Sequence, residues 1–558
     1  MSEAIPAMVG NQPVLILKEG STRSRGKEAQ ASNIMAAKVV AEVVKSSLGP
    51  KGMDKMLVDS LGDVTITNDG ATILDEMEIQ HPAAKMMVEV SKTTDKEVGD
   101  GTTSAVVLAG EFLKKAEELL EKNVHPTIIV DGYRKSIDKA LEVLAKIAIK
   151  ATSTDKSILR KVAITSMASK AVSEEKEYLA DLVVDVVLKV SEKLDAGYKV
   201  DIDAIKVEKK AGGSVTETRL IDGIAFDKEV VHPDMPKRVE NAKIALIESP
   251  LEIEKTEFDA KINIESPDQM KAFLDEEARM LKDMVDKLVK AKVNVAVCQK
   301  GIDDLSQHYL AKAGILGIRR VKESDMDKAA KATGAKIVTN LDDLTSSDLG
   351  TAKIVEERKI GEDKWTFVEG CKNARSLTLL IRGGTEKVVD EADRSIHDAL
   401  MVVRDVVQQP KIVAGGGGPE VELASQLRRW SEQLSGREQL AAQGFAEAME
   451  IIPSTLAENA GMEPIDVIAE LRSKHEKGGS WAGVDVLDGK VKDMAKIDVY
   501  EPLAVKEQII KSSGEAACMI LRIDDVVAAG KMKGGGGPPG GPGGEGMGGM
   551  GGEDGGLD

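Results

Sequence analysis

Residues 99–103 read Gly-Asp-Gly-Thr-Thr and lead directly into the apolar segment Ser104-Ala-Val-Val-Leu-Ala-Gly110. This order predicts a loop followed by a helix, because Gly99 and Gly101 allow a positive φ and Thr102 and Thr103 are candidate N-caps. A helix N-terminus offers unpaired N–H groups and a partial positive charge, which suit a phosphate. Asp100 would repel that phosphate unless a hard cation such as Mg²⁺ lay between them. From these residues alone, an ordinary Asp-Gly turn that caps a helix is an equally good interpretation.

Two neighbouring segments add to this pattern. Leu48-Gly-Pro-Lys-Gly-Met-Asp54 follows a helical repeat of apolar residues, and Gly49 with Pro50 is expected to stop that helix. Residues 64–67 alternate apolar and polar side chains like a short strand, and Asn68-Asp69-Gly70 reads as a turn. The chain has no P-loop, since none of its Gly-Lys pairs is followed by Ser or Thr.

The composition limits the class of protein. A net charge of −18 argues against a dedicated nucleic-acid binder, because neutralising phosphates requires clustered Lys and Arg. We find no run of about 18 apolar residues to span a membrane, and no signal-peptide pattern at the start. Cys298, Cys371 and Cys518 lie far apart, and the six histidines show no metal-ligand spacing. These features predict a cytoplasmic protein with reduced thiols.

The length and periodicity predict a multidomain fold. At 558 residues the chain exceeds the roughly 250–300 residues at which single cores stop growing. Helical periodicity dominates residues 31–150 and 420–475, whereas 206–250 and 293–380 alternate strand-like runs with short helices. The predicted fold class is therefore multidomain, with mainly α flanks and a middle that is α/β or α+β. Pro13-Val-Leu-Ile-Leu17 is a candidate strand that pairs with another element or another subunit.

Several ordered motifs resemble one family. LGPKGMDKML (48–57), TNDGATIL (67–74) and GDGTTSAVV (99–107) are similar to the equatorial domain of a chaperonin. DKEVVHPDMPKRVENAKIAL (227–246), CQKGIDDLSQHYLAKAGI (298–315) and VEERKIGEDKWTFVEGCKN (355–373) resemble the group II branch, which contains the archaeal thermosome and its eukaryotic cytosolic relatives. The Gly/Met-rich end of the chain favours the archaeal group, and the resemblance extends over roughly residues 20–530.

The resemblance implies a chaperonin architecture in which both flanks of the sequence form one domain. The implied parts are an equatorial ATP-binding domain at 1–150 and 405–530, a small α/β intermediate domain at 151–220 and 372–404, an α/β apical substrate-binding domain at 221–371 with a helical lid protrusion at about 249–280, and a disordered Gly/Met-rich tail at 531–558.

The segment at 249–290 has an unusual pattern. Ser266-Pro-Asp-Gln269 predicts a helix start with Pro in the first turn, and apolar residues follow at helical spacing. In isolation, ordinary core packing is the better interpretation. The resemblance instead implies a lid whose apolar side chains are partly exposed to unfolded clients when it is open; these are Leu251, Ile253, Phe258, Ile262, Ile264, Met270 and Phe273.

The resemblance also assigns the residues of ATP hydrolysis. Asp100 matches the Mg²⁺ ligand, Asp69 an acidic residue near the γ-phosphate, and Asp398 the carboxylate that polarises the attacking water. Taken alone, Asp398 is better interpreted as a solvated charge on a helix whose buried face is Val388, Val389, Ile396, Leu400 and Val403, with His397 structural. Lys170 resembles a nucleotide-sensing lysine, and a surface lysine is the alternative.

The remaining implied nucleotide contacts come from several loops. Gly418 stands where relatives often have Ala, Glu501 replaces the Asp usual in bacterial relatives, and Arg382-Gly-Gly-Thr385 is a candidate hinge. The contacts are Leu48, Gly49, Pro50, Asn68, Gly70, Gly101, Thr102, Thr103, Ser104, Gly415, Gly416, Gly417, Gly483, Asp485, Val486 and Glu501.

The implied function is an ATP-dependent chaperone that encloses non-native proteins in stacked rings of identical or paralogous subunits, with a built-in lid and no separate lid co-chaperonin. The implied cofactors are ATP and Mg²⁺, with K⁺ as a further candidate. The expected partners include unfolded proteins and exclude nucleic acid and membranes. Two alternatives remain at this point: a stand-alone ATPase or kinase, and a ring or filament scaffold with vestigial nucleotide binding.

Overall fold

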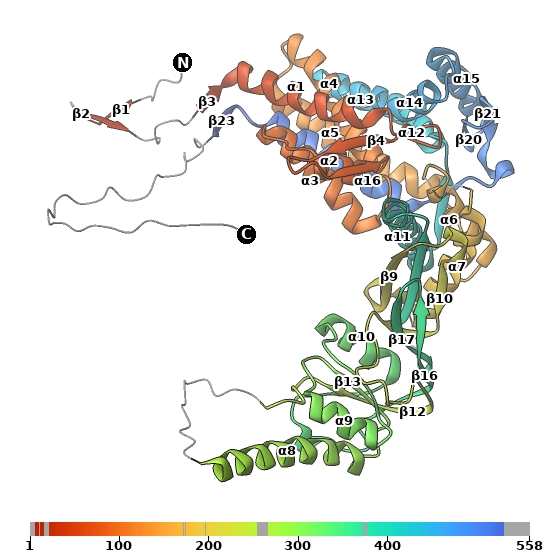
Figure 1. The fold of residues 1–558 in the computed structure, drawn as a ribbon. Coiled ribbons are helices and arrows are strands. Elements are labelled where there is room, and N and C mark those ends of the chain that lie inside the picture. Colours follow the sequence, from red (N-terminus) through yellow and green to blue (C-terminus); the bar gives the residue numbers. More distant parts are fainter. Residues whose placement is uncertain are drawn as a thin grey trace, which may run out of the picture. The chain divides into compact units, whose positions relative to one another are not determined.

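The computed structural model describes residues 6–9, 12–15, 22–170, 172, 174–195, 197–253, 266–371 and 376–528 (Figure 1). The chain divides into two compact units, residues 1–30 with 523–558 and residues 31–522. In the first unit, β1 (Pro6–Val9) pairs with β2 (Gln12–Leu15), and β3 (Thr22–Arg25) pairs with β23 (Asp525–Ala528). The predicted strand at 13–17 is confirmed over residues 13–15, and its partner is another element of the chain. The predicted tail at 531–558 lies outside the described residues.

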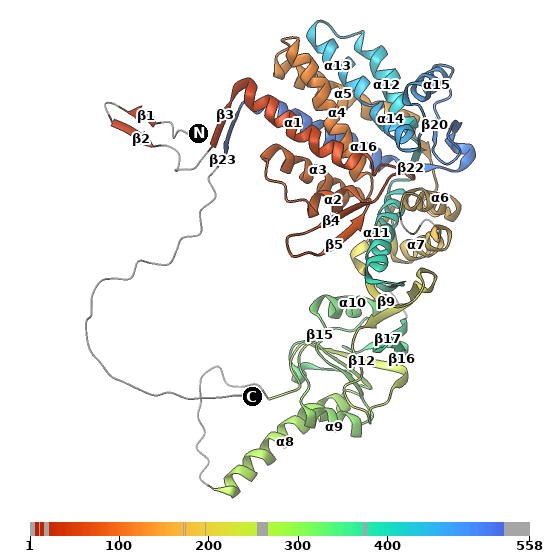
Figure 2. The same cartoon turned by 45° about the horizontal axis from the view of Figure 1, so that its top comes forward.

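A helical part of the larger unit draws on both flanks of the sequence. Its helices are α1 (Gly26–Lys45, which starts in the smaller unit), α2 (Gly70–Glu76), α3 (Pro82–Val98), α4 (Thr102–Glu121), α5 (Pro126–Ile147), α12 (Gly418–Ser431), α13 (Arg437–Ala448), α14 (Ile451–Asn459), α15 (Pro464–Glu476) and α16 (Leu503–Leu521). Helix α16 packs against α3, α4 and α5, and α13 packs against α4 and α5. Figures 1 and 2 show these early and late helices side by side, so the two flanks share one core.

Short strands accompany these helices. They are the hairpin β4 (Lys55–Val58) with β5 (Val64–Thr67), the hairpin β20 (Ala482–Asp485) with β21 (Lys490–Asp493), and the sheet of β22 (Tyr500–Pro502), β19 (Lys411–Ala414) and β6 (Ile149–Lys150). A one-turn helix, η4 (Met494–Ile497), follows β21. Strand β5 and the turn after it lie where the sequence predicts them.

A second group of elements surrounds the long helix α11 (Glu386–Gln408). It contains α6 (Lys156–Met167), α7 (Lys176–Val190), the hairpin β7 (Ser191–Leu194) with β8 (Gly197–Val200), the sheet β10 (Arg219–Ile221), β18 (Leu377–Gly383) and β9 (Ile205–Ala211), and the short helices η1 (Ile202–Ala204) and η2 (Val215–Glu217). Helix α11 packs on α6, α7 and this sheet. It also contacts α3 and α16, so it connects the sheet to the helices of the first group.

A seven-stranded mixed sheet forms the third group. Its strands are β11 (Gly223–Phe226), β17 (Asp363–Cys371), β16 (Gly350–Ile360), β12 (Arg238–Ile247), β13 (Val295–Cys298), β14 (Leu316–Ile318) and β15 (Ile337–Val338), with α8 (Pro267–Lys290), α9 (Asp304–Lys312), α10 (Glu323–Thr333) and η3 (Leu341–Asp343). Both the helical flanks and the mixed middle of the predicted fold class are thus observed. The domain boundaries expected from the resemblance stay a prediction.

Helix α8 begins as the sequence predicts. Ser266 caps it by accepting a hydrogen bond from the Gln269 N–H, with Pro267 at the first position. Its first half exposes Met270, Phe273 and Leu274, whereas its second half packs on the mixed sheet. The expectation that Leu251 is exposed is wrong, because this residue is fully buried beside Ile302. Ile253 is half-buried, while Phe258, Ile262 and Ile264 lie outside the described residues.

Two local expectations about the helix ends need correction. Gly101 is the N-cap of α4, with φ 79°, so Thr102 and Thr103 are the first helical residues rather than caps. Helix α1 ends at Lys45, before the predicted stop at Gly49 and Pro50, because the next N–H groups bond three residues back: Ser47 to the Val44 oxygen and Leu48 to the Lys45 oxygen. No helix among the described residues is long and apolar enough to cross a membrane.

An aromatic cluster anchors the shared helical core. The rings of Phe112 and Phe445 are stacked with centroids 4.1 Å apart, and Tyr133 meets Phe445 edge-on at 5.3 Å. The Tyr133 hydroxyl donates to the Phe112 carbonyl at 2.8 Å. All three side chains are fully buried, so this cluster joins α4, α5 and α13.

We predict that Phe445→Ala lowers the free energy of unfolding of this core by about 3–5 kcal/mol, because truncating a buried aromatic side chain leaves a cavity. Chemical denaturation followed by far-UV circular dichroism measures the change. The matched control is Leu440→Ala on the same helix, whose side chain is 43% exposed and whose loss should cost within about 0.5 kcal/mol. Equal effects of the two substitutions would contradict the assigned core.

Candidate active site

The turn at Asn68-Asp69-Gly70 lies directly against the start of α4. Asp69 caps α2 by accepting hydrogen bonds from the Thr72 N–H and hydroxyl, both at 2.8 Å. Its other carboxylate oxygen accepts the Thr102 hydroxyl at 3.0 Å. Gly70 packs so tightly that a Cβ there would lie 2.8 Å from the Thr103 nitrogen. Two motifs that are separate in the sequence therefore form one structural element.

The start of α4 has the form of an anion site. Gly99 and Gly101 both adopt positive φ, and Gly101 caps the helix with no side-chain hydrogen bond. The Asp100 carboxylate accepts the Gly101 N–H at 2.6 Å and lies at the edge of a cavity. A helix N-terminus without a side-chain cap can direct its N–H groups and dipole toward a bound anion.

Lys170 and Asp398 form a buried ion pair beside this element. The Lys170 Nζ lies 2.7 Å from the Asp398 Oδ2, and the two side chains are only 7% and 8% exposed. The surface interpretations of both residues are therefore wrong. On α11, Val389, Ile396, Leu400 and Val403 are buried as expected. Val388 is wrongly placed on that face, since it is 42% exposed.

The loop that carries Lys170 is held in place by a side chain that hydrogen-bonds to its backbone. The Asn68 side-chain amide donates to the Ser169 carbonyl, which ties this loop to the turn before α2.

The expectation that His397 is structural is not met, because its side chain is exposed and lines a cavity next to Asp398.

Three carboxylates share the field of one buried ammonium. Burial raises the pKa of Asp398 well above its usual value, the nearby charges of Asp69 and Asp100 add to this, and Lys170 opposes it. Burial alone would raise the pKa of Asp69. The charge of Lys170 and the hydrogen bonds from Thr72 and Thr102 outweigh burial, so the pKa of Asp69 is lowered. Burial opposes the charge on Lys170, yet the carboxylates outweigh it and raise its pKa. Asp69 thus stays ionised, while Asp398 is the carboxylate suited to accept a proton.

A cavity of about 410 Å³ lies on one side of these residues, and we call it the glycine cavity. Its walls come from α4, α6, β20, β22 and α16, from the turn that follows α1 and from the turn before α12. The predicted contacts that line it are Leu48, Gly49, Pro50, Asp100, Gly101, Ser104, Gly416, Gly417, Asp485, Val486 and Glu501. This volume is in the range of small-molecule sites.

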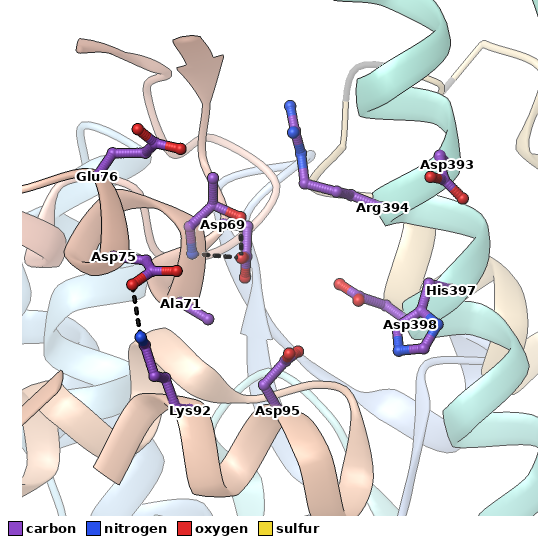
Figure 3. Close-up of a pocket in the computed structure, with 11 residues that line it drawn as sticks. Asp69, Ala71, Asp75, Glu76, Lys92, Asp95, Asp393, Arg394, His397 and Asp398 are labelled. Carbon is purple, nitrogen blue, oxygen red and sulfur yellow. Dashed lines mark hydrogen bonds and ion pairs between the residues drawn. The ribbon is translucent and has the colours of Figure 1, made fainter. Parts of the chain in front are cut away.

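A second cavity of about 430 Å³, which we call the acidic cavity, contains Asp69 and Asp398. Figure 3 shows Asp398 and His397 projecting from α11 toward Asp69 and Asp95 on the opposite wall. The other lining residues are Ala71, Thr72, Asp75, Glu76, Lys92, Asp393 and Arg394. Asp398 therefore lines the acidic cavity and does not line the glycine cavity.

The other predicted contacts lie behind these walls. Asn68, Gly70, Thr102, Thr103 and Lys170 hold the turn and the helix start, and Gly415 and Gly483 pack backbone to backbone. A Cβ on Gly483 would lie 2.7 Å from the Gly415 oxygen, and the Val484 N–H donates to the Gly416 oxygen at 2.8 Å. A Cβ on Gly418 would lie 2.8 Å from the Ala482 oxygen. An alanine at position 418 would therefore require this strand to shift.

The side chains around the glycine cavity could hold a cation such as Mg²⁺ only if a bound ligand supplied further oxygen atoms. Among the described residues no group of three or more His, Cys, Asp or Glu side chains could hold a metal ion. Mg²⁺ in phosphate sites is commonly bound by one or two carboxylates with substrate oxygens and water completing its shell. Asp100 at the rim of the glycine cavity meets that requirement.

Sequence reasoning missed two groups of residues around the cavities. At the glycine cavity, Lys506 forms ion pairs with both Glu420 and Glu501. Lys161 lines the same cavity. Asp95 lines the acidic cavity. The only local signal for Lys506 is its place in the first turn of a helix that follows Glu501 and Pro502.

Comparisons with known proteins agree on one family. A model described as the TCP-1/cpn60 chaperonin family matches residues 40–531. The thermosome subunit of Pyrococcus horikoshii is 58% identical over 537 residues, which cover 95% of this chain and 98% of that protein. Thermosome subunit alpha of Archaeoglobus fulgidus is 58% identical over 534 residues, covering 96% and 98%. Thermosome subunit beta of Thermococcus kodakarensis is 58% identical over 527 residues, covering 94% and 96%.

We predict that Lys170→Met destabilises the fold by about 3–5 kcal/mol at neutral pH, because it leaves Asp398 as a buried unpaired charge. The loss should shrink as the pH falls, since Asp398 then takes up a proton. Lys170→Met/Asp398→Leu should recover most of the stability. Thermal unfolding at several pH values measures all three effects.

The matched control for this prediction is Lys156→Met, which removes a lysine that is 68% exposed at the start of α6 and should change stability by less than about 1 kcal/mol. A Lys170→Met protein as stable as this control at neutral pH would contradict the buried pair.

Proposed function

Because this chain belongs to the TCP-1/cpn60 chaperonin family, we propose how its described residues carry out the family's reaction. The protein is an ATP-dependent molecular chaperone and an ATPase, a group II chaperonin of the thermosome type that works in double-ring assemblies. The observation that carries the proposed mechanism is the buried Lys170–Asp398 pair next to Asp69 and the open start of α4.

The triphosphate of ATP lies at the start of α4 in this proposal. The first residues of α4, Thr102 and Thr103, would supply backbone N–H groups to it, and the positive φ of Gly101 lets the backbone approach closely. Asp100 would hold Mg²⁺, which would neutralise phosphate charge when bound. The backbone-to-backbone packing of the 415–417 turn on β20 shapes the opposite wall. A K⁺ site stays a prediction, with no observation on a described residue to place it.

Asp398 acts as the general base. Its pKa is raised by burial and by neighbouring carboxylates, which makes it a better proton acceptor than an ordinary aspartate. The acidic cavity gives water access to this carboxylate from the solvent side. Asp69, held ionised by Thr72 and Thr102, orients the water without accepting its proton.

Lys170 is the residue whose contacts differ between nucleotide states in this proposal. In this structure, the Lys170 ammonium forms an ion pair with the Asp398 carboxylate. A bound triphosphate offers the ammonium a stronger anionic partner, which frees Asp398 to act on water. A ligand shifts a conformational equilibrium only through contacts that differ between the states, and this contact meets that condition.

We assign the three groups of elements to the equatorial, intermediate and apical domains expected from the resemblance, with the boundaries given above. The exposed first half of α8 supports the lid assignment, since Met270 and Phe273 are 49% and 42% exposed. Such flexible apolar side chains suit contact with varied unfolded proteins. Subunits of the same or a paralogous kind would complete the rings. No described contact favours a stand-alone kinase or a scaffold with vestigial nucleotide binding.

We predict that Asp398→Ala binds ATP but hydrolyses it about 10²–10⁴ times more slowly, because the general base is gone. Phosphate release under saturating ATP measures the rate, and calorimetry measures binding. The control is Glu386→Ala, an exposed acidic residue in the first turn of the same helix, which should hydrolyse ATP normally. Normal turnover by Asp398→Ala would remove the proposed role.

We predict that Asp100→Ala lowers the affinity of the site for Mg²⁺–nucleotide. We expect at least a roughly tenfold loss, the size seen even for groups that only support a metal ligand. Calorimetry of ADP binding with Mg²⁺ and with a chelator separates a loss of metal binding from a loss of direct nucleotide contact. If Asp100 holds the metal, the affinities of the variant and the parent protein should differ less once Mg²⁺ is absent. A loss of the same size under both conditions would contradict the metal-ligand role.

A further inference from the structure

A second buried lysine lies at the glycine cavity, between two glutamates. The Lys506 Nζ is 2.8 Å from the Glu420 Oε1 and 2.6 Å from the Glu501 Oε2. The side chains of Lys506 and Glu420 are each only 5% exposed. The three residues belong to the first turn of α16, the first turn of α12 and strand β22, so one ammonium ties together three walls of the site.

Glu501 is the member of this cluster that is open to a ligand. Its side chain is 24% exposed, and it lines the glycine cavity. One carboxylate oxygen is held by Lys506, while the other lies close to Gly415, where a Cβ would be 3.1 Å from it. The carboxylate thus has a fixed position between the ammonium and the bare glycine backbone.

The charge of the cluster defines the ligand chemistry that it accepts. Two carboxylates share one ammonium, which leaves a net charge of −1 at a buried place. Burial and the nearby charge of Glu420 raise the pKa of Glu501, and the charge and hydrogen bond of Lys506 oppose this rise. An ionised carboxylate only accepts hydrogen bonds, so it suits a ligand with adjacent hydroxyl donors, such as the sugar of a ribonucleotide.

We propose that Lys506 is a positioning residue that sets the sugar preference of the site, by holding Glu501 where it accepts hydrogen bonds from the ribose hydroxyls. This inference rests on the proposed placement of the nucleotide sugar at Glu501. It makes the protein prefer ribonucleotides to 2′-deoxyribonucleotides through a residue that does not itself touch the sugar. A lysine that only neutralised two glutamates would affect stability and leave the sugar preference unchanged.

The test compares the affinities of ADP and 2′-deoxy-ADP, measured with Mg²⁺ by calorimetry on the assembled protein. Lys506→Met alone would leave two unpaired buried carboxylates, so the informative variant is Lys506→Met/Glu420→Gln. It keeps the net charge of −1 because one glutamate is neutralised together with the lysine. Lys506→Gln/Glu420→Gln is a second variant of the same charge. Glu420→Gln and Glu501→Gln are the matched single variants.

We expect the parent protein and Glu420→Gln to bind ADP roughly tenfold more tightly than 2′-deoxy-ADP, the factor typical of a hydrogen bond to a charged group. In Glu501→Gln and in both Lys506 double variants the ratio should fall to about threefold or less. For ATP hydrolysis, the KM of the double variants should rise by a larger factor than their kcat falls, since a merely structural lesion would not act selectively on binding.

Two outcomes would overturn the proposal in different ways. If Glu501→Gln loses the sugar preference while a double variant keeps it, Lys506 does not position Glu501, and the ribose contact stands. If Glu501→Gln keeps the preference, the placement of the sugar at Glu501 fails, and the inference about Lys506 fails with it. The hydrolytic roles of Asp398 and Asp100 are untouched by either result.

Discussion

The structure of the site depends on one buried ammonium, that of Lys170, in the combined field of Asp398, Asp69 and Asp100. Unpaired carboxylates are costly in a low-dielectric interior, so the protein must supply a cation, hydrogen bonds or a proton to each one. Lys170 supplies the cation to Asp398, and Thr72 and Thr102 supply hydrogen bonds to Asp69. The remaining negative charge fits a site that receives a phosphate chain together with a metal ion.

A second buried lysine among carboxylates lies at the glycine cavity. Lys506 is shared by Glu420 and Glu501 just as Lys170 is shared by the aspartates, and each cluster keeps an excess of negative charge. Glycines pack tightly beside this second cluster, where a Cβ on Gly415 would lie 3.1 Å from a Glu501 oxygen and one on Gly416 would lie 2.7 Å from the Val484 oxygen. The lysines therefore hold the acidic groups, and the glycines let the backbone pack closely along the wall of the cavity.

Local rules explain what could be predicted from the sequence. The strand at 64–67, the turn at Asp69, the positive φ of Gly99 and the cap at Ser266 each depend on a few neighbouring residues. The pairs Lys170–Asp398 and Lys506–Glu420 join residues 228 and 86 positions apart, which no local pattern encodes. The predictions that Val388 is buried and that Leu251 is exposed were both wrong for the same reason, since tertiary neighbours decide which apolar side chain is covered. The family resemblance supplied Asp398, Lys170 and Glu501, but it did not supply the contacts that hold them.

The connections of α11 show how a change at Asp398 can act on the rest of the larger unit. This helix begins at Glu386, shortly after strand β18, which pairs with β9. On β9, the buried Lys206 contacts Asp325 of α10 at 3.0 Å and the Ala225 carbonyl of β11 at 2.7 Å. A third buried lysine thus joins the sheet beneath α11 to the mixed sheet. A shift of α11 that followed the release of Asp398 from Lys170 would strain or carry along these contacts, because packed interiors do not deform continuously. The ion pair that restrains Asp398, the proposed general base, is therefore also placed to restrain the part of the molecule that carries the exposed face of α8.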